Sequence, residues 1–250
     1  MITKRIVTTL TFNNGILFRT KLFTPDYRYT ANFIDAWSVD EIVVLDISRD
    51  GRGQNDPFFQ SLEKLAQDCM VPIAAGGGIQ SIEDVQRFLD RGADKIVLNT
   101  AAIRKPQLIT EIAERYGRQC IVVSIDARRS EDGLYEVYSD CGRCRENVVL
   151  ADWVKKAEEL GAGEILITSI DRDGWLQGYD LELVSEVSSS CEVPVLALGG
   201  CGNWAQMDEL FAKTNVSAAC TQNIYHFTES SIKSAKKYLA GKGVHVRPSV

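Results

Sequence analysis

The sequence is poor in histidine and contains no long apolar run. It has two histidines among 250 residues, and no Cys-His-acid arrangement for nucleophilic catalysis is legible in it. No run reaches the roughly 18–20 apolar residues that a membrane span requires. The first residues also lack the apolar core and cleavage site of a signal peptide. We therefore expect a chain that neither crosses nor enters a membrane.

An excess of basic residues is also absent. The chain has 28 Lys and Arg against 34 Asp and Glu, a net charge of −6. This balance argues against a general nucleic-acid or anionic-membrane binder, although it leaves room for a local anion site. Seven cysteines show no disulfide-framework spacing, which favours a reducing, cytoplasmic compartment. Cys141 and Cys144 form one CxxC, but zinc needs four ligands, so two incidental loop thiols are the simpler interpretation.

What the sequence does contain is an internal repeat. Residues 43–51 (VVLDISRDG) return as residues 166–174 (LITSIDRDG), about half a chain later. Residues 71–78 (VPIAAGGG) correspond to 193–200 (VPVLALGG), and 6–11 correspond to 121–126. Such a repeat is the first feature to look for in an unfamiliar chain. In the last pair one copy ends in Thr11 and the other in Asp126, an asymmetry that matters below.

Short β-branched runs alternate with amphipathic segments along the whole chain. We expect strands at residues 5–11, 41–47, 71–75, 95–99, 120–126, 164–169, 193–198 and 217–221. We expect helices at residues 60–69, 81–91, 147–160 and 180–189. Strands that are almost continuously apolar suit a parallel sheet covered by helices.

Eight strand–helix units with a half-chain repeat predict an α/β fold, a (β/α)8 TIM barrel. We expect one domain over residues 1–250, built from half-barrels at about 1–117 and 118–250. A doubly wound open sheet is the alternative, but it explains the repeat less well. Residues 13–29 form a longer polar and aromatic stretch, which we interpret as a mobile loop over the site.

In a TIM barrel the chemistry lies at the carboxyl ends of the strands. A glycine turn there, Gly76-Gly77-Gly78, would expose backbone amides to an anion. Asn99 and Thr100 end the next strand and would complete a phosphate cradle, although glycines also simply close tight turns. The repeat predicts a second cradle, weakened by Leu198 and the bulky Gln222, at Gly174, Gly199, Gly200, Gln222 and Asn223.

Charged residues occur at both ends of the expected strands. Asp126 is placed for general acid/base work, with a solvated or salt-bridged loop carboxylate as the alternative. Asp46, Asp171 and Asp173 could hold substrate hydroxyls, or could cap and brace loops. At the opposite ends we expect a ring of balanced charge from alternate strands, or a structural salt-bridge plug, made by Arg5, Glu41, Lys95 and Glu164.

Taken together, these motifs resemble the cyclase subunit of imidazole glycerol phosphate synthase, essentially from end to end. The segments that carry the resemblance include GGGI at 76–79, GADK at 92–95, NTAA at 99–102, IDA at 125–127, DRDG at 171–174 and GYD at 178–180. The resemblance implies a two-half TIM barrel without a cofactor, which binds a substrate with two phosphates. It also implies a glutaminase subunit at the barrel base, an ammonia gate formed by the four charged residues, and Asp94 at that interface.

The sequence departs from the family at the positions that carry the family's catalytic and phosphate-binding residues. The family uses two aspartates as acid and base, whereas here one of the two positions holds Thr11. A threonine hydroxyl holds its proton too tightly to serve as a base near neutral pH. The family's loop lysine is Arg19, which keeps the charge but not the geometry. Leu198 and Gln222-Asn223 replace smaller residues in the second cradle.

These departures lead to the hypothesis of a divergent paralogue. It would take ammonia from a glutaminase and pass it to another reaction, as in the amidination of surface (lipopolysaccharide) sugars with a third, ATP-using amidotransferase. The alternative is a histidine-biosynthesis cyclase. A third hypothesis assigns the chain a different kind of function, that of a non-catalytic scaffold or a metal-binding barrel that uses Cys141 and Cys144.

Overall fold

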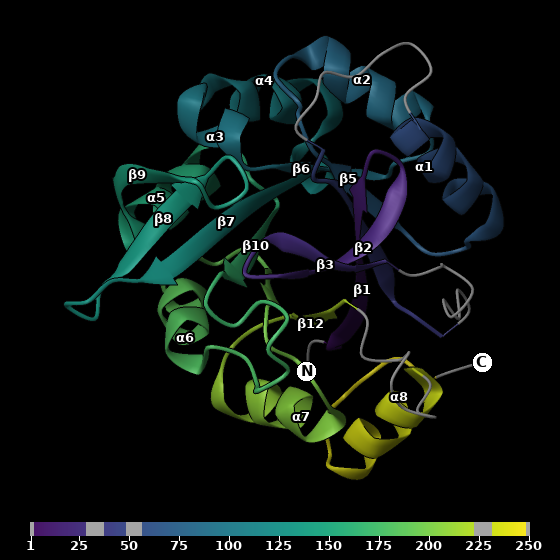
Figure 1. Cartoon of the computed structure of the whole chain (residues 1–250), viewed down its shortest axis with the longest axis vertical. Coiled ribbons are helices and arrows are strands. Elements are labelled where there is room, and N and C mark those ends of the chain that lie inside the picture. The colour runs from purple at the N-terminus through teal and green to yellow at the C-terminus, as the bar shows by residue number, and fades with distance from the viewer. Residues whose placement is uncertain (1–2, 29–37, 49–56, 223–231, 249–250) are drawn as a thin grey trace.

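The computed structural model describes residues 3–28, 38–48, 57–222 and 232–248. Within these, eight parallel strands close into a barrel surrounded by helices (Figure 1). The barrel strands, in order around the barrel, are β1 (Arg5–Asn13), β4 (Glu41–Asp46), β5 (Ile73–Gly76), β6 (Lys95–Leu98), β7 (Ile121–Arg129), β10 (Glu164–Ser169), β11 (Val195–Leu198) and β12 (Ala218–Thr221). The predicted TIM barrel is confirmed, and each predicted strand overlaps one of these.

Helices cover the outside of the barrel. They are α1 (Pro57–Asp68), α2 (Ile82–Asp90), α3 (Thr100–Arg104), α4 (Gln107–Tyr116), α5 (Leu150–Leu160), α6 (Leu181–Ser190), α7 (Trp204–Lys213) and α8 (Ile232–Gly241), with a short 3-10 turn at Arg118–Cys120. Each packs an apolar face onto the sheet, and burying one large aliphatic side chain there contributes about 1.5–3 kcal/mol. None of the described helices has the length and apolar character needed to cross a membrane.

The repeat extends to the ends of the helices. The hydroxyl of Ser81 accepts from the backbone amide of Asp84 at 3.3 Å and begins α2. At the corresponding place in the second half, the side chain of Asn203 accepts from the amide of Gln206 at 3.1 Å and begins α7. These side chains satisfy amide groups that have no partner inside the helix. The two halves therefore use the same local structure as well as similar sequence.

Two hairpins stand on the barrel, and the sequence interpretation missed both. They are formed by β2 (Ile16–Lys21) with β3 (Thr24–Arg28) and by β8 (Tyr135–Ser139) with β9 (Cys144–Val149). The stretch 13–29 does lie at the site, where Thr20 and Phe23 line the cavity described below, but the expectation of a loop is wrong for its described part, residues 13–28, which forms antiparallel strands. The sequence also contains a turn signal at the start of this stretch. The Asn14-Gly15 pair, with φ of 50° and 72°, makes the two-residue turn between β1 and β2, and such turns typically join antiparallel strands. Because β9 occupies the preceding residues, α5 begins at Leu150 rather than at residue 147.

The hairpins continue the repeat. The first barrel strand of each half extends beyond the barrel and pairs antiparallel with the next strand. This pairing places Thr11 opposite Phe18 in β2 and Asp126 opposite Tyr138 in β8. In Figure 1, β2 and β3 lie across the middle of the barrel view, and β7 and β8 extend to one side. The hairpins therefore arise at the two residues that the sequence selected as the asymmetric catalytic pair.

Candidate active site

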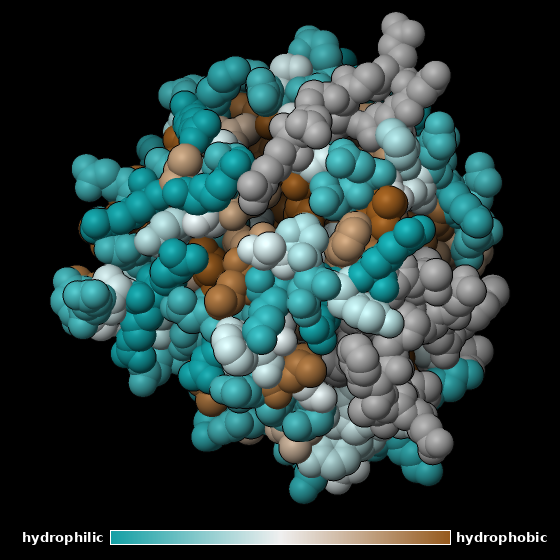
Figure 2. All heavy atoms as spheres, viewed as in Figure 1, coloured by the Kyte–Doolittle hydropathy of each residue, from teal (hydrophilic) through white to brown (hydrophobic). Residues whose placement is uncertain are grey.

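A cavity of about 500 Å³ opens at the carboxyl ends of the barrel strands. The residues that line it include many of the predicted site residues, namely Thr11, Asp46, Gly77, Gly78, Asn99, Thr100, Asp126 and Asp173. Space-filling atoms in Figure 2 show a mostly hydrophilic face with hydrophobic residues near its centre. The size is typical of a small-molecule site. Strand ends alone therefore predicted eight of the residues in the wall of this cavity.

Asp126 lies in the wall of this cavity and is 8% exposed. Burial, together with the nearby charge of Asp173, raises the pKa of its carboxyl to about 7, against the opposing effect of hydrogen bonds from the hydroxyls of Thr168 and Ser124. Its Oδ2 accepts a hydrogen bond from Nδ2 of Asn99 at 3.1 Å. A carboxyl with a pKa near neutrality both takes up and releases protons at physiological pH, as a general acid/base requires.

Thr11 also lines the cavity, but its hydroxyl is directed to the backbone. It donates a hydrogen bond to the carbonyl oxygen of Phe18, the residue opposite it in the β1–β2 pairing. The hydroxyl therefore braces the hairpin. Thr11, which corresponds to Asp126 in the repeat, therefore makes a structural contact and does not provide a second carboxylate at the mouth.

Asp173 lines the cavity and holds the β2–β3 hairpin. It is 2% exposed, and its oxygens accept from Oγ1 of Thr20 at 3.0 Å and from the backbone amide of Phe23 at 2.9 Å. Its own carbonyl accepts from the amide of Leu22 at 3.2 Å. Burial raises the pKa of this carboxyl, while the hydrogen bonds from Phe23 and Thr20 lower it. One aspartate therefore fixes the hairpin over the mouth and stands close enough to Asp126 to raise its pKa.

The remaining candidate carboxylates have different settings. Asp46 lines the cavity and accepts from the amide of Ser48 at 2.8 Å. Asp171 does not line it; it accepts from the backbone amide of Arg129 at 2.8 Å and lies 3.7 Å from Arg128. Of the three aspartates expected near the substrate, Asp171 is thus the one that the structure uses to brace the neighbouring strand.

The first glycine cradle lies in the cavity. Gly77 and Gly78 have φ of 120° and 65°, and a Cβ on Gly77 would lie 2.2 Å from the carbonyl oxygen of Asp46. Only glycine permits this close approach of two chain segments. Thr100 lies just beyond the next strand, at the start of α3, where its hydroxyl accepts from the amide of Asp140 at 3.0 Å.

Two cations at the first cradle escaped the sequence interpretation. Arg104 and Lys105 line the cavity from the end of α3. The only available signal was a basic pair five residues beyond Asn99-Thr100. Positive side chains beside exposed backbone amides are a setting in which an anion is stabilised.

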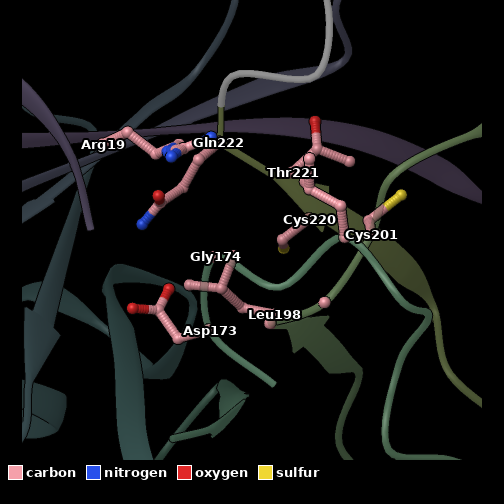
Figure 3. A pocket seen from close by; sticks show the side chains of 11 residues that line it. Arg19, Asp173, Gly174, Leu198, Cys201, Cys220, Thr221 and Gln222 are labelled. Atoms are coloured by element: carbon pink, nitrogen blue, oxygen red, sulfur yellow. The ribbon is translucent and has the colours of Figure 1, made fainter. Parts of the chain in front are cut away.

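The second cradle has the same backbone but almost no space. Gly199 and Gly200 have φ of 103° and 98°, and a Cβ on Gly199 would lie 2.7 Å from the carbonyl oxygen of Ser169, the repeat partner of Asp46. The cavity at this place measures only about 20 Å³. Figure 3 shows Leu198 and Gln222 facing it from two sides. Gly174 also lines it, and Asn223, the remaining predicted member, lies outside the described residues.

Four charged residues form a closed ring at the opposite end of the barrel. The two cations each contact both carboxylates: Arg5 lies 2.6 Å from Glu41 and 2.8 Å from Glu164, and Lys95 lies 3.0 Å and 2.8 Å from the same two. Their side chains are between 2% and 23% exposed. The predicted ring of balanced sign is confirmed. The expectation that all four come from alternate strands is wrong, because β1 and β4, which carry Arg5 and Glu41, are neighbours.

Apolar side chains fill the barrel between the ring and the cavity. These side chains form a separate hydrophobic cluster in the interior of the barrel, which includes Val7, Val43, Ala74, Val97, Val122 and Leu166. Asp94 lies beside the ring, exposed, and its Oδ2 accepts from the amide of Ile73 at 2.8 Å. The barrel therefore has a charged base, an apolar interior and a polar mouth along one axis.

The described residues hold no cluster of three or more His, Cys, Asp or Glu side chains suited to a metal ion. Cys141 lies in the β8–β9 turn and lines the cavity, and Cys144 contacts Asp140 at 3.9 Å. The structure therefore supplies no further ligands for the CxxC among these residues.

The fold and the site define a class: a TIM barrel whose mouth carries a buried carboxyl with a pKa near 7 and a glycine turn of positive φ. Comparison with known proteins names the family. The chain matches the family described as "Histidine biosynthesis protein" over residues 7–231, and it belongs to that family.

Its relatives match over nearly the whole chain. It is 42% identical over 254 residues to the imidazole glycerol phosphate synthase subunit HisF of Clostridium botulinum (strain Okra / Type B1), covering 99% of this chain and 100% of the relative. The subunits of the same name from Methanocaldococcus jannaschii and Bacillus cereus (strain G9842) are each 40% identical, covering 99% of this chain and 99% or 100% of the relative. The predicted resemblance to this cyclase-subunit family is confirmed.

Proposed function

We propose that the chain is the cyclase subunit of an imidazole glycerol phosphate synthase and acts in histidine biosynthesis. The observation that carries the proposal is the alignment of three features along one barrel axis: the charged ring at the base, the apolar interior and Asp126 at the mouth. Relatives that carry this name match 99% of the chain. The proposal makes the subunit an enzyme that uses ammonia and a phosphorylated substrate.

The residues of the mouth would divide the work as follows. A phosphate group of the substrate binds at Gly77 and Gly78, beside Thr100 and the cations Arg104 and Lys105. Asp126, with its pKa of about 7, takes a proton from one substrate atom and returns it to another. The amide of Asn99 fixes the orientation of that carboxyl. Asp46 and Asp173 are the carboxylates placed to meet substrate hydroxyls, and Arg19 stands where the family has its loop lysine.

The base of the barrel would receive the ammonia. In this proposal a glutaminase subunit docks at the end that carries the ring, with the exposed Asp94 at the interface. Arg5, Glu41, Lys95 and Glu164 form the gate, and ammonia then passes through the apolar interior to the mouth. Neutral ammonia enters an apolar passage without the large desolvation cost that ammonium would meet.

A second candidate function is delivery of ammonia to a different acceptor. Two observations favour it: Thr11 supplies no carboxylate, and the second glycine cradle is nearly closed. Sugar amidination, our first hypothesis from the sequence, falls in this group. The relatives named above are described as imidazole glycerol phosphate synthase subunits, and none is described as a sugar-modifying protein. The comparisons therefore give no support to a lipopolysaccharide role or to a third, ATP-using partner.

The test is cyclase activity with ammonium ion and the family's open-chain bisphosphate substrate. Wild type, Thr11→Asp and Asp126→Asn are compared. Turnover by wild type that is lost in Asp126→Asn establishes the cyclase. No turnover by wild type, with the substrate intact, overturns the first proposal in favour of the second. If Thr11→Asp then turns the substrate over, the missing carboxylate is the block, and if it does not, the acceptor differs.

A further inference from the structure

The two glycine cradles have matching backbones but very different spaces. Gly77 and Gly78 open into the mouth cavity, which measures about 500 Å³ as a whole, whereas Gly199 and Gly200 line a separate space of only about 20 Å³. Both turns have positive φ and press against the carbonyl of the repeat-related residue, Asp46 or Ser169. Since the backbone is the same, side chains must decide the difference.

Gln222 is the side chain that closes the second cradle. It leaves the end of β12 and reaches towards the hairpin, beside Arg19 in Figure 3. Its Oε1 accepts from the backbone amide of Thr20 at 3.2 Å, and its Nε2 donates to Oγ1 of the same residue at 2.8 Å. That hydroxyl donates in turn to Oδ1 of Asp173 at 3.0 Å. Two hydrogen bonds and a buried carboxylate therefore hold Gln222 in place.

The equivalent residue of the first half behaves differently. Asn99 occupies the place in the repeat that Gln222 occupies in the second half. Its amide turns to the barrel strand and donates to the Asp126 carboxylate and to the carbonyl oxygen of Ser124, both at 3.1 Å. A shorter side chain with an inward partner leaves the first cradle open. The longer Gln222, with partners on the hairpin, fills the second.

The open cradle also has more positive side chains near it than the closed cradle. Arg104, Lys105 and Arg143 line the open cavity. At the closed cradle Arg19 is the lining cation among the described residues, and its guanidinium is paired with Asp26. Phosphate binding draws on nearby positive charge as well as on backbone amides.

We propose that Gln222, backed by Leu198, is a plug in the second anion cradle and sets how many phosphate groups the site accepts. The protein binds one phosphate group, in the first cradle, and a second group enters only by displacing Gln222 from Thr20. The proposal rests on the proposed function only for the use of the first cradle as a phosphate site. A substrate with one phosphate fits without rearrangement, and one with two must break both hydrogen bonds of the plug.

The test is the number of inorganic phosphate ions bound per chain, measured by equilibrium dialysis with labelled phosphate. Wild type should bind one, and Gln222→Ala should bind two. Gln119→Ala is the matched control, because its amide donates to the carbonyl of Tyr116 at 3.2 Å, away from either cradle; it should bind one. Arg104→Ala should weaken the wild-type phosphate and leave the added one of Gln222→Ala in place.

Two outcomes would overturn the proposal: two ions bound by wild type, or one ion bound by a folded Gln222→Ala with a circular dichroism spectrum like that of wild type. If the alanine variant does not fold, Gln222→Asn replaces it, since it has the side chain that leaves the first cradle open. In that case a count of one with Gln222→Asn overturns the proposal.

A probe with two phosphates gives a second measurement. Ribulose 1,5-bisphosphate should bind Gln222→Ala about tenfold more tightly than wild type, since the loss of roughly 1.4 kcal/mol of plug contacts corresponds to one decade. Ribulose 5-phosphate should bind the two proteins equally. Equal affinities for the bisphosphate would count against the plug. Neither measurement uses ammonia or turnover, so a failed phosphate count removes the plug and leaves the cyclase proposal standing, and a failed cyclase assay leaves the plug standing. If both proposals hold, the bisphosphate substrate of the cyclase displaces Gln222 from Thr20 when it binds.

Discussion

The side-chain amide of Asn99 lies 3.1 Å from Oδ2 of Asp126 and donates a hydrogen bond to it. Asn99 directly follows β6, and Asp126 lies in the neighbouring barrel strand, β7. The contact fixes the direction of a buried carboxyl whose pKa burial raises to about 7. An oriented acid with that pKa is the most specific chemical feature of the mouth, and the first predictions concern it.

Replacing Asp126 with Asn should lower the ammonium-dependent rate by about 10²–10⁴, the usual contribution of a positioned acid/base group. The KM for the phosphorylated substrate should change little, because the phosphate site that we propose is the glycine cradle and not Asp126. Steady-state kinetics at saturating ammonium measures both. Asp132→Asn, at an exposed carboxylate in the β7–β8 turn, is the control and should keep full activity. A kcat within twofold of wild type for Asp126→Asn would remove it from the mechanism.

The same substitution should make stability depend less on pH. The native carboxyl of Asp126 holds its proton up to about pH 7, whereas an unfolded Asp loses it near 3.9. Between these values the native state binds more protons, so the wild type loses stability as pH rises. Asp126→Asn should therefore gain stability relative to wild type from pH 4 to pH 8, by up to about 4 kcal/mol. Urea unfolding at pH 4, 6 and 8 measures this, and a constant difference would contradict it.

Removing the charge of Asp173 should shift the pH profile of the reaction. The nearby negative charge raises the pKa of Asp126, so Asp173→Asn should move the corresponding limb of log kcat/KM to lower pH. The hairpin contacts survive in part, because an asparagine oxygen still accepts from Thr20 or Phe23. Asp171→Asn, whose carboxylate braces Arg129 outside the cavity, should leave the limb in place. A limb that does not move in Asp173→Asn would mean that another group titrates there.

Breaking the charged ring should uncouple glutamine consumption at the base of the barrel from product formation at its mouth. Lys95→Ala removes both contacts of Lys95 with Glu41 and Glu164. With a glutaminase partner present, we expect glutamine to be consumed without a matching amount of product, while the rate with added ammonium stays near wild type. Lys213→Ala, which breaks an exposed pair with Glu209, is the control, because such pairs contribute at most about 1 kcal/mol. A one-to-one ratio of glutamate to product in Lys95→Ala would argue that the ring has only a structural role.

The first glycine cradle should not tolerate a side chain. Gly77→Ala places a Cβ 2.2 Å from the carbonyl oxygen of Asp46 at φ of 120°, so it should abolish phosphate binding and cost well over the ~1–2 kcal/mol of a positive φ alone. Gly133→Ala also has a positive φ, of 87°, but meets nothing within 4 Å. It should cost only that conformational strain and keep phosphate binding. Thermal unfolding and phosphate titration compare the pair, and equal losses would mean that backbone strain, not contact, decides.

The sequence by itself determined the barrel, its repeat and the order of its eight barrel strands along the chain. Apolar runs of four to six residues alternate with amphipathic helices, and this pattern depends on local period and composition. For the same reason it placed Asp126, Gly77, Asn99 and the four charges of the ring at the correct ends of the barrel. It also contained the Asn14-Gly15 signal for the tight turn between β1 and β2, which our interpretation of this stretch as a loop passed over.

Only the tertiary structure decided what each side chain of the mouth contacts. Thr20 meets Asp173, 153 residues away, and Gln222, 202 residues away. No local pattern reports such contacts, because they depend on how the barrel closes and on which rotamer each side chain adopts. The same holds for the outward turn of Asp171 and for the closed second cradle, whose glycines look like those of the first in sequence. The chain thus carries two similar half-sites, and packing across the barrel mouth leaves one open and fills the other.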